Sequence, residues 1–203
     1  LDWHGSVAAY HAAKLALLDW TERRILGSGV PGNGLDLATC GDGRFLGSGG
    51  PFLGNRADLG LRGEHNVRNA CLALTAALVL GATPAEIRAR LPRIRALPHR
   101  LQVVHRGRWT WIDDSIATTP EACQAALAAV EGPVGLIAGG ADKGATWEVL
   151  ARIVRDRGAE VACIGRTGPA LAAAIGDRAK DLGTLAAAVA DLLRRVPAGG
   201  IIL

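Results

Sequence analysis

The sequence predicts an α/β protein in two parts, with a mostly parallel sheet in the second part. Apolar and polar side chains alternate from Leu101 to Ile112, which is the two-residue repeat of paired strands. Small and apolar residues then repeat at helical spacing after Pro120, and short apolar runs alternate with helical segments as far as Leu203. Strands separated by helices imply right-handed crossovers and a parallel sheet, whose ligands gather at the carboxyl ends of the strands.

In the second part we expect a hairpin around the Arg106–Arg108 turn and a helix that begins at Pro120, with Thr118 or Thr119 as its cap. The further expected strands are 134–138, 161–164 and 201–203, and the further expected helices are 147–156, 171–175 and 185–195. Because the last segment is an apolar strand and the chain holds no Met, we expect a piece of a longer protein.

The first part is expected to mix helices with short antiparallel strands. Ser6 should cap a helix over 7–20, a strongly apolar helix should end at Gly81, and Thr83-Pro84 should open a short helix. The glycine-rich stretch 27–63 indicates hairpins and loops, with 35–38 and 44–46 as the best strand candidates. Pro98 stops helix propagation in an extended link over 96–101, so we place the domain boundary between 1–97 and 98–203.

Composition excludes several classes of function. The 203 residues carry 23 Lys and Arg against 19 Asp and Glu, for a net charge of +4, without a basic run, and aromatic residues are too sparse for base stacking. We therefore expect no nucleic-acid partner. The four cysteines lie far apart and outside any Cys-x-x-Cys pair, which indicates a reducing compartment and hence a cytoplasmic protein. No apolar run has membrane-spanning length, so we expect no membrane partner.

The turn over 112–120 concentrates polar atoms. It holds Asp113, Asp114, Ser115, Thr118 and Thr119 at the start of the predicted helix. Acids, hydroxyls and a positive helix end in one turn suit an anionic or nucleotide ligand. The alternative is a capped turn with surface acids.

Two asparagines form a second candidate group. Asn66 and Asn69 are three residues apart, so on a helix they share a face. Side-chain amides both donate and accept hydrogen bonds, which suits the edge of a purine. The alternative is that Asn66 caps the helix.

Three isolated cations complete the candidates. Lys14 lies inside the first helix, where the alternative is a solvated lysine, and Arg100 lies at the link, where it reaches a phosphate or forms a structural salt bridge. Lys143 lies in Gly-Gly-Ala-Asp-Lys-Gly, whose composition resembles a phosphate loop without the Gly-x-x-x-x-Gly-Lys-Ser/Thr pattern.

Taken together, four ordered motifs resemble the Mur ligases, and among them the members that add glutamate. These motifs are Gly-Glu-His-Asn-Val-Arg-Asn-Ala (63–70), Leu-Pro-His-Arg-Leu (97–101), Asp-Asp-Ser-Ile-Ala-Thr-Thr-Pro (113–120) and Gly-Gly-Ala-Asp-Lys-Gly (139–144). The opening Leu-Asp-Trp-His-Gly-Ser and Lys14 fit the same family. The resemblance implies an incomplete central ATP-binding α/β domain over 1–97, followed by a Rossmann-like C-terminal, glutamate-binding domain over 98–203.

The resemblance also implies a role for each candidate residue. Lys14, carbamoylated, matches a ligand of Mg²⁺, and Lys14 and Lys143 are the catalytic candidates. Asn66 and Asn69 match residues near the adenine of ATP. Arg100 and Asp114 match residues on the nucleotide side, while Ser115, Thr118 and Lys143 match the substrate side, where the carboxylates of glutamate are received.

The implied cofactors are ATP and Mg²⁺, and the implied substrates are UDP-N-acetylmuramoyl-L-alanine and glutamate. The resemblance further implies a monomeric, cytoplasmic ligase of peptidoglycan synthesis, with a role in cell shape and cell division. Closing one domain on the other would bring the two sets of residues together and exclude water from the acyl phosphate.

Several departures from the family pattern qualify these expectations. The central Gly-Lys-Thr phosphate loop, the nucleotide-sugar domain and a later Ser-Pro-rich loop are missing, so we expect these 203 residues alone to be inactive. Ile116 stands where the common form has lysine, which removes a cation from the amino-acid pocket. The hypothesis is that L-glutamate replaces D-glutamate. The alternatives are another Mur-type or folylpolyglutamate-type ligase, or a non-catalytic nucleotide-binding module.

Overall fold

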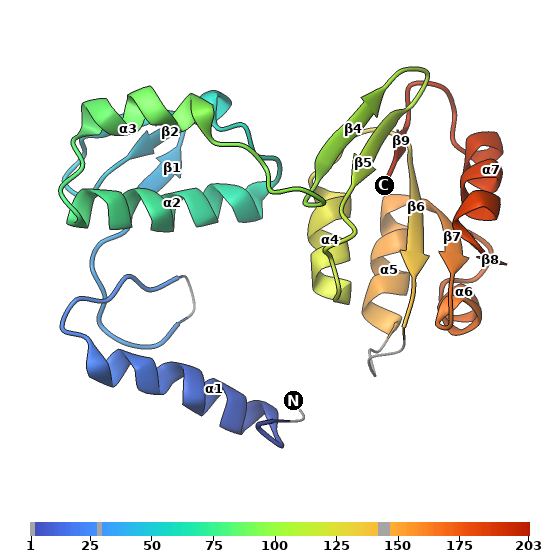
Figure 1. Cartoon of the computed structure of the whole chain (residues 1–203), viewed down its shortest axis with the longest axis horizontal. Helices are drawn as coiled ribbons and strands as arrows, with labels where there is room; N and C mark the ends of the chain where they lie inside the picture. Colours follow the sequence, from blue (N-terminus) through green and yellow to red (C-terminus); the bar gives the residue numbers. More distant parts are fainter. Residues whose placement is uncertain (1–2, 28–29, 142–146) are drawn as a thin grey trace. The chain divides into compact units, whose positions relative to one another are not determined.

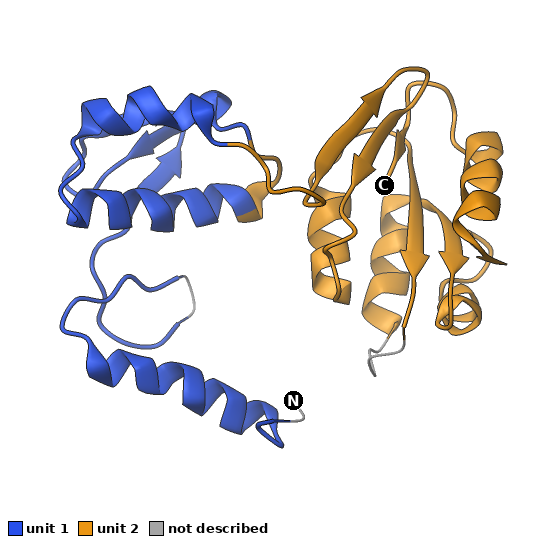
Figure 2. Cartoon of the chain, in the orientation of Figure 1, with its two compact units in different colours: residues 1–60, 66–94 blue, residues 61–65, 95–203 orange. Residues whose placement is uncertain are grey.

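The computed structural model describes residues 3–27, 30–141 and 147–203. The chain divides into two compact units (Figure 2). Unit 1 holds residues 1–60 and 66–94, and unit 2 holds residues 61–65 and 95–203. The predicted domain boundary after residue 97 stays a proposal.

Unit 1 combines helices with a small antiparallel sheet (Figure 1). Its elements are α1 Val7–Leu15, η1 Ala16–Trp20, β1 Thr39–Gly41, β2 Arg44–Leu46, β3 Phe52–Asn55, η2 Arg56–Asp58, α2 Glu64–Val79, α3 Pro84–Arg90 and η3 Leu91–Arg93. The strands pair in the order β1-β2-β3, and both pairings are antiparallel.

The β1–β2 hairpin turns at Asp42-Gly43, where φ is +48° and +70°. Positive φ at both central residues matches the twist of the flanking strands, which is why this dipeptide makes tight hairpins. Of the two predicted strands, 44–46 is confirmed as β2, but 35–38 is wrong. Ala38 instead donates its N–H to Thr75 Oγ1 of α2 at 2.8 Å, and pairing begins one residue later at Thr39.

The predicted helix starts are confirmed where a hydroxyl residue caps them. The side chains of Ser6, Thr83 and Thr119 accept hydrogen bonds from the backbone N–H of Ala9, Glu86 and Ala122, respectively. Each cap satisfies a backbone N–H that has no partner inside its helix.

Unit 2 is built on one six-stranded sheet. Its elements are β4 Gln102–Arg106, β5 Thr110–Asp113, α4 Pro120–Ala128, β6 Val134–Gly139, α5 Glu148–Arg157, β7 Glu160–Ile164, α6 Gly168–Ile175, β8 Ala179–Gly183, α7 Leu185–Arg195 and β9 Ile201–Ile202. The strand order is β4-β5-β9-β6-β7-β8. Only the β4–β5 pair is antiparallel, which confirms the predicted α/β class with a mostly parallel sheet.

Helices cover both faces of this sheet (Figure 1). Along β7, Val161 and Cys163 pack with residues of α4, α5 and α6, whereas Ala162 between them packs against Ala188 and Leu192 of α7. Side chains of a strand alternate between the two faces, so a strand buried on both sides is apolar throughout. This explains why the run 161–164 is recognisable in the sequence.

Two predictions for the second half are wrong. β8 was missed, because it is an edge strand with exposed Lys180 and Asp181 and therefore lacks an apolar run. The link over 96–101 is not extended throughout. It makes a turn over 98–101, with φ of +61° at His99 and +45° at Leu101.

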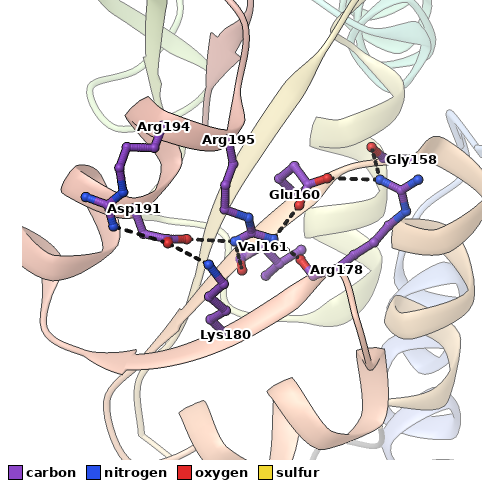
Figure 3. A network of polar contacts seen from close by, with 8 residues as sticks. All are labelled: Gly158, Glu160, Val161, Arg178, Lys180, Asp191, Arg194 and Arg195. Carbon is purple, nitrogen blue, oxygen red and sulfur yellow. Dashed lines mark hydrogen bonds and ion pairs between the residues drawn. The ribbon is translucent and has the colours of Figure 1, made fainter.

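A polar network joins β7, β8 and α7 (Figure 3). Asp191 is 2% exposed and accepts from Arg195 at 2.8 Å and from Lys180 at 3.0 Å. Arg195 also pairs with Glu160 and donates to the carbonyl of Val161. Burial alone would raise the pKa of Asp191, but the hydrogen bonds from Arg195 and Lys180 outweigh burial and hold this pKa below its ordinary value.

None of the helices in the described part of the chain is both long and apolar enough to cross a bilayer.

Candidate functional site

Asp114 is the central side chain of the predicted turn. It follows β5 directly, is half-buried, and accepts a hydrogen bond on Oδ1 from the N–H of Leu101 at 2.9 Å. Burial raises the pKa of this carboxyl, while the Leu101 N–H and the charges of Arg100 and His65 oppose that rise. Asp114 is therefore a desolvated acid beside two basic side chains, which is a common arrangement at functional sites.

His65 reaches this site from the separate segment 61–65. That segment lies close to α4, since a Cβ placed on Gly63 would be 2.9 Å from the Cβ of Ala129. The basic groups around Asp114 thus come from two stretches of chain that are more than 30 residues apart in sequence.

The turn over 98–101, here called the entry turn, is bonded to the acidic turn over 113–117. His99 Nδ1 lies 2.7 Å from Asp113 Oδ2, and the N–H of Ile116 donates to the carbonyl of His99 at 3.3 Å. An ionised carboxylate only accepts, so Nδ1 carries the proton of this bond. The hydrogen bonds from His99 and from the N–H of Ser115 hold the pKa of Asp113 below its ordinary value.

The entry turn is strained at two positions. His99 and Leu101 both have positive φ, which costs an L-residue roughly 1–2 kcal/mol each. The Leu101 side chain is 6% exposed and packs in the core with Ile112. Burial of Leu101 and the bonds to Asp113 and Asp114 offset this strain.

The predicted substrate-side residues lie near Asp114 on the exposed side of the turn. Ser115 and Thr118 are both exposed, and Thr118 immediately precedes the cap of α4. Ile116 is also exposed, at 50%. Lys143, with its neighbours 142–146, lies outside the described residues.

Cys123 on α4 is a structural thiol beside this turn. Burial, with a smaller effect of the Asp114 charge, raises its pKa to about 12. A thiol with this pKa is protonated at neutral pH and is a poor nucleophile. Cys123 therefore acts as a small hydrophobic residue.

The β6 and β7 carboxyl ends meet closely next to the candidate loop. A Cβ on Gly139 would lie 2.0 Å from the carbonyl oxygen of Ile164, and the N–H of Gly140 donates to the same oxygen at 3.2 Å. Buried Thr167 donates its N–H to the carbonyl of Gly140. Packing therefore requires glycine at residue 139, whereas Gly140 is favoured by its φ of +134° alone.

The remaining candidates lie in unit 1. Asn66 is buried in the first turn of α2 and Asn69 is exposed, with Asn69 Nδ2 3.5 Å from Asn66 Oδ1. Because α2 begins at Glu64, Asn66 is not its cap, so that alternative is wrong. Lys14 is exposed on α1, with Nζ 4.7 Å from the centre of the Tyr10 ring.

The sequence grouped Asp113, Asp114, Ser115 and Thr118 in one turn and placed Arg100 at the link. It missed the contributions of His99 and His65 to this site. Leu-Pro-His-Arg-Leu includes His99, yet nothing linear reports a left-handed backbone or a bond across 14 residues of sequence.

Comparisons with known proteins agree with this fold. The family described as "Mur ligase, glutamate ligase domain" matches residues 99–203. A UDP-N-acetylmuramoylalanine--D-glutamate ligase of Rubrobacter xylanophilus is 45% identical over 133 residues, which is 64% of this chain and 30% of that protein. A UDP-N-acetylmuramoyl-L-alanine--L-glutamate ligase of Xanthomonas campestris pv. campestris is 33% identical over 201 residues, which is 90% of this chain and 43% of that protein.

Solved structures show the same fold. MurC from Thermotoga maritima has a TM-score of 0.66 at 16% identity, covering 99% of this chain and 52% of that one. The sheet thus defines an α/β protein whose acidic turn lies at the carboxyl end of β5. The chain belongs to the Mur ligase family. It spans less than half the length of the two curated relatives described above.

Proposed function

We propose that the chain is part of an ATP-dependent ligase that joins glutamate to UDP-N-acetylmuramoyl-L-alanine in peptidoglycan synthesis, as MurD does. This proposal rests on one observation, namely that the relatives of this chain are named as glutamate ligases. Two proteins that align with 64% and 90% of the chain are both glutamate ligases, and both names specify the same nucleotide-sugar amino acid.

In this proposal, ATP supplies the phosphoryl group that turns the substrate carboxylate into an acyl phosphate. The amine of glutamate attacks the acyl carbon, an amide bond forms, and the carbon–oxygen bond to phosphate breaks. The products are the amide, ADP and inorganic phosphate. The protein must orient both substrates and exclude water, which would otherwise hydrolyse the acyl phosphate.

Asp114 and Arg100 serve the nucleotide side. Asp114 Oδ1 is already bonded to Leu101, which leaves Oδ2 to accept from a ligand hydroxyl. The Arg100 guanidinium, exposed beside Asp114, presents a fork of donors suited to phosphate oxygens. In unit 1, Asn69 is exposed and offers its amide to the adenine edge, with buried Asn66 orienting it.

Among the described residues, Lys14 is the Mg²⁺ ligand in this proposal, provided that it is modified. A lysine amine is not an oxygen ligand, whereas a carbamate on Nζ would be one. Lys14 is exposed, so its amine is open to modification. The described residues include no group of three or more His, Cys, Asp or Glu that could hold a metal ion. The other ligands of Mg²⁺ in this proposal are phosphate oxygens, water and groups outside the described residues.

Thr118, Ser115 and Lys143 serve the incoming glutamate. Exposed hydroxyls beside the positive N-terminus of α4 favour a carboxylate. We place the protein, as a monomer, in the cytoplasm, with a role in cell shape and cell division. A folylpolyglutamate-type ligase is the weaker alternative, because its relatives here share the fold at 15% identity.

The enantiomer of glutamate is the open choice within this proposal. The relative with the highest identity of the two described is named for D-glutamate, and the relative that covers 90% of the chain is named for L-glutamate. The exposed Ile116 side chain carries no charge for a carboxylate, so we expect glutamate to be held differently from forms with lysine at this position, and L-glutamate is our hypothesis.

The test uses a full-length protein that includes these residues. We expect phosphate release from ATP only when UDP-N-acetylmuramoyl-L-alanine and one enantiomer of glutamate are both present. Release that persists without either substrate, or that requires a folate substrate, would overturn the proposal.

The Ile116→Lys variant tests the basis of enantiomer choice. We expect L-glutamate to be used by the parent protein and the preference to shift toward D-glutamate in Ile116→Lys, measured as the ratio of kcat/KM for the two enantiomers. Clear D-glutamate preference in the parent protein would reject the role assigned to Ile116.

A further inference from the structure

We propose that His99 is a positioning residue that clamps the entry turn (98–101) onto the acidic turn (113–117) and so fixes Arg100 and Asp114 for the nucleotide. This inference rests on the proposed function for its ligand, but the clamp itself is a property of unit 2 alone.

Three hydrogen bonds connect the two turns, and together they involve both strained residues. His99 Nδ1 bonds to Asp113 Oδ2 at 2.7 Å, Leu101 N–H to Asp114 Oδ1 at 2.9 Å, and Ile116 N–H to the His99 carbonyl at 3.3 Å. Arg100 lies between the two residues with positive φ, so its direction depends on both.

Only one of the three bonds uses side chains on both turns, namely His99 to Asp113. The Leu101 bond uses the Asp114 side chain and a backbone N–H, and the Ile116 bond uses backbone groups on both turns. The His99 side chain is 63% exposed and that of Asp113 is 29% exposed, so burial of the pair does not hold the turns. The clamp is therefore directional, and a hydrogen bond of this kind fixes geometry more than it adds stability.

The Asp113 carboxylate is well suited to this role. Its Oδ1 accepts from the N–H of Ser115 at 2.9 Å while Oδ2 accepts from His99, so both oxygens are used within the clamp. Asp114, by contrast, keeps Oδ2 for a ligand. The two adjacent acids thus have different roles in this proposal. Asp113 holds the turns together, and Asp114 binds the nucleotide.

The chemistry of residue 99 allows a sharp set of variants. Asn carries an N–H donor on Cγ, as His carries Nδ1 on Cγ, and Asn tolerates positive φ. His99→Asn should therefore preserve the clamp. His99→Leu keeps bulk but loses the donor, and His99→Gly relieves the backbone strain without supplying a donor. His105→Leu, at an exposed histidine on β4 outside the clamp, is the matched control.

The first readout is amide hydrogen exchange in the 203-residue chain. In His99→Leu and His99→Gly we expect exchange at Leu101 and Ile116 to accelerate by at least about tenfold, with other core amides of unit 2 unchanged. His99→Asn and His105→Leu should match the parent chain. Unchanged exchange at Leu101 and Ile116 in His99→Leu, or failure of His99→Asn to restore it, would overturn the clamp.

The second readout is ATP binding and turnover in the full-length protein. We expect His99→Leu to raise the Kd and the KM for ATP by about tenfold while kcat changes by less than about twofold, with recovery in His99→Asn. An unchanged Kd for ATP in His99→Leu would overturn the positioning role. A Kd for ATP in His99→Gly equal to that of the parent protein would also overturn it. If the parent protein binds ATP but forms no amide product, the proposed function is wrong. The clamp is then still tested by amide hydrogen exchange and by the Kd for ATP.

Discussion

At the scale of single residues, we expect the Asp114 carboxylate to lower the stability of the fold and to contribute to ligand binding. Its pKa is raised by burial, so the folded protein holds this proton more tightly than the unfolded chain does. The charged form of Asp114 therefore lowers the stability of the fold above the folded-state pKa, and this cost disappears as the pH falls below the ordinary carboxyl pKa of about 3.9.

The Asp114→Asn variant separates the two effects. Because the amide oxygen can still accept from Leu101 and no charge is buried, we expect thermal stability at pH 7 to be equal to or higher than that of the parent chain. We expect the KM for ATP in the full-length protein to rise by about tenfold, the effect of losing one hydrogen bond to a charged group. A large loss of stability with unchanged KM would mean that Asp114 is structural.

Asp191 has the opposite effect on stability, because its pKa is lowered and not raised. Its lowered pKa means that the folded protein favours the carboxylate, which adds stability above the ordinary carboxyl pKa and loses it as the pH falls through the lowered value. Asp191→Ala also removes one of the carboxylate partners of Arg195, whose side chain is only 15% exposed. We expect a loss of about 3 kcal/mol in the free energy of unfolding of unit 2.

The matched control for Asp191 is Arg194→Ala. Arg194 lies 3.4 Å from the same carboxylate, but its side chain is 70% exposed, so we expect a loss below about 1 kcal/mol. Both variants are compared by urea unfolding at pH 7 and at pH 4. Equal losses for the two variants would contradict the role assigned to the buried carboxylate.

At the scale of elements, the β6–β7 junction depends on the absence of a side chain at residue 139. Gly139 and Gly140 have nearly the same φ, +135° and +134°, but only a Cβ on Gly139 meets a described backbone atom, the carbonyl oxygen of Ile164. We expect Gly139→Ala to lower the melting temperature of unit 2 by several degrees more than Gly140→Ala, because both share the conformational strain and only the first adds a clash. Equal shifts would show that strain alone matters.

The elements that the sequence predicted correctly are those with a local cause. Hydroxyl caps at Ser6, Thr83 and Thr119 act within one turn of helix, and the apolar run 161–164 reflects burial on both faces of the sheet. β8 escaped prediction because an edge strand needs no such run. The left-handed entry turn escaped because its stabilising partners, Asp113 and Asp114, lie more than ten residues away.

The candidate site follows the same rule. Asp114 was predictable because it ends a strand and precedes a capped helix, two features visible in the sequence. His65 and His99 join it only through the tertiary structure, from the first turn of α2 and from the chain after α3. Lys143 stays a prediction, as do the carbamoylation of Lys14 and the roles of Asn66 and Asn69.

At the scale of the whole molecule, the chain belongs to the Mur ligase family and spans less than half the length of two of its relatives. The family described as "Mur ligase, glutamate ligase domain" matches residues 99–203, and the relatives are more than twice as long as the parts that align with this chain. For the full-length protein we propose a chemical sequence in which ATP activates a carboxylate and glutamate then captures it.

Transfer of labelled oxygen tests this claim most directly. The full-length protein is given ATP, glutamate and UDP-N-acetylmuramoyl-L-alanine whose free carboxylate carries heavy oxygen, and the released phosphate is analysed by mass spectrometry. An acyl phosphate predicts that each phosphate released during amide formation carries one oxygen from that carboxylate. Amide formation with unlabelled phosphate would contradict the acyl phosphate, and release of phosphate without any amide product would contradict the ligase.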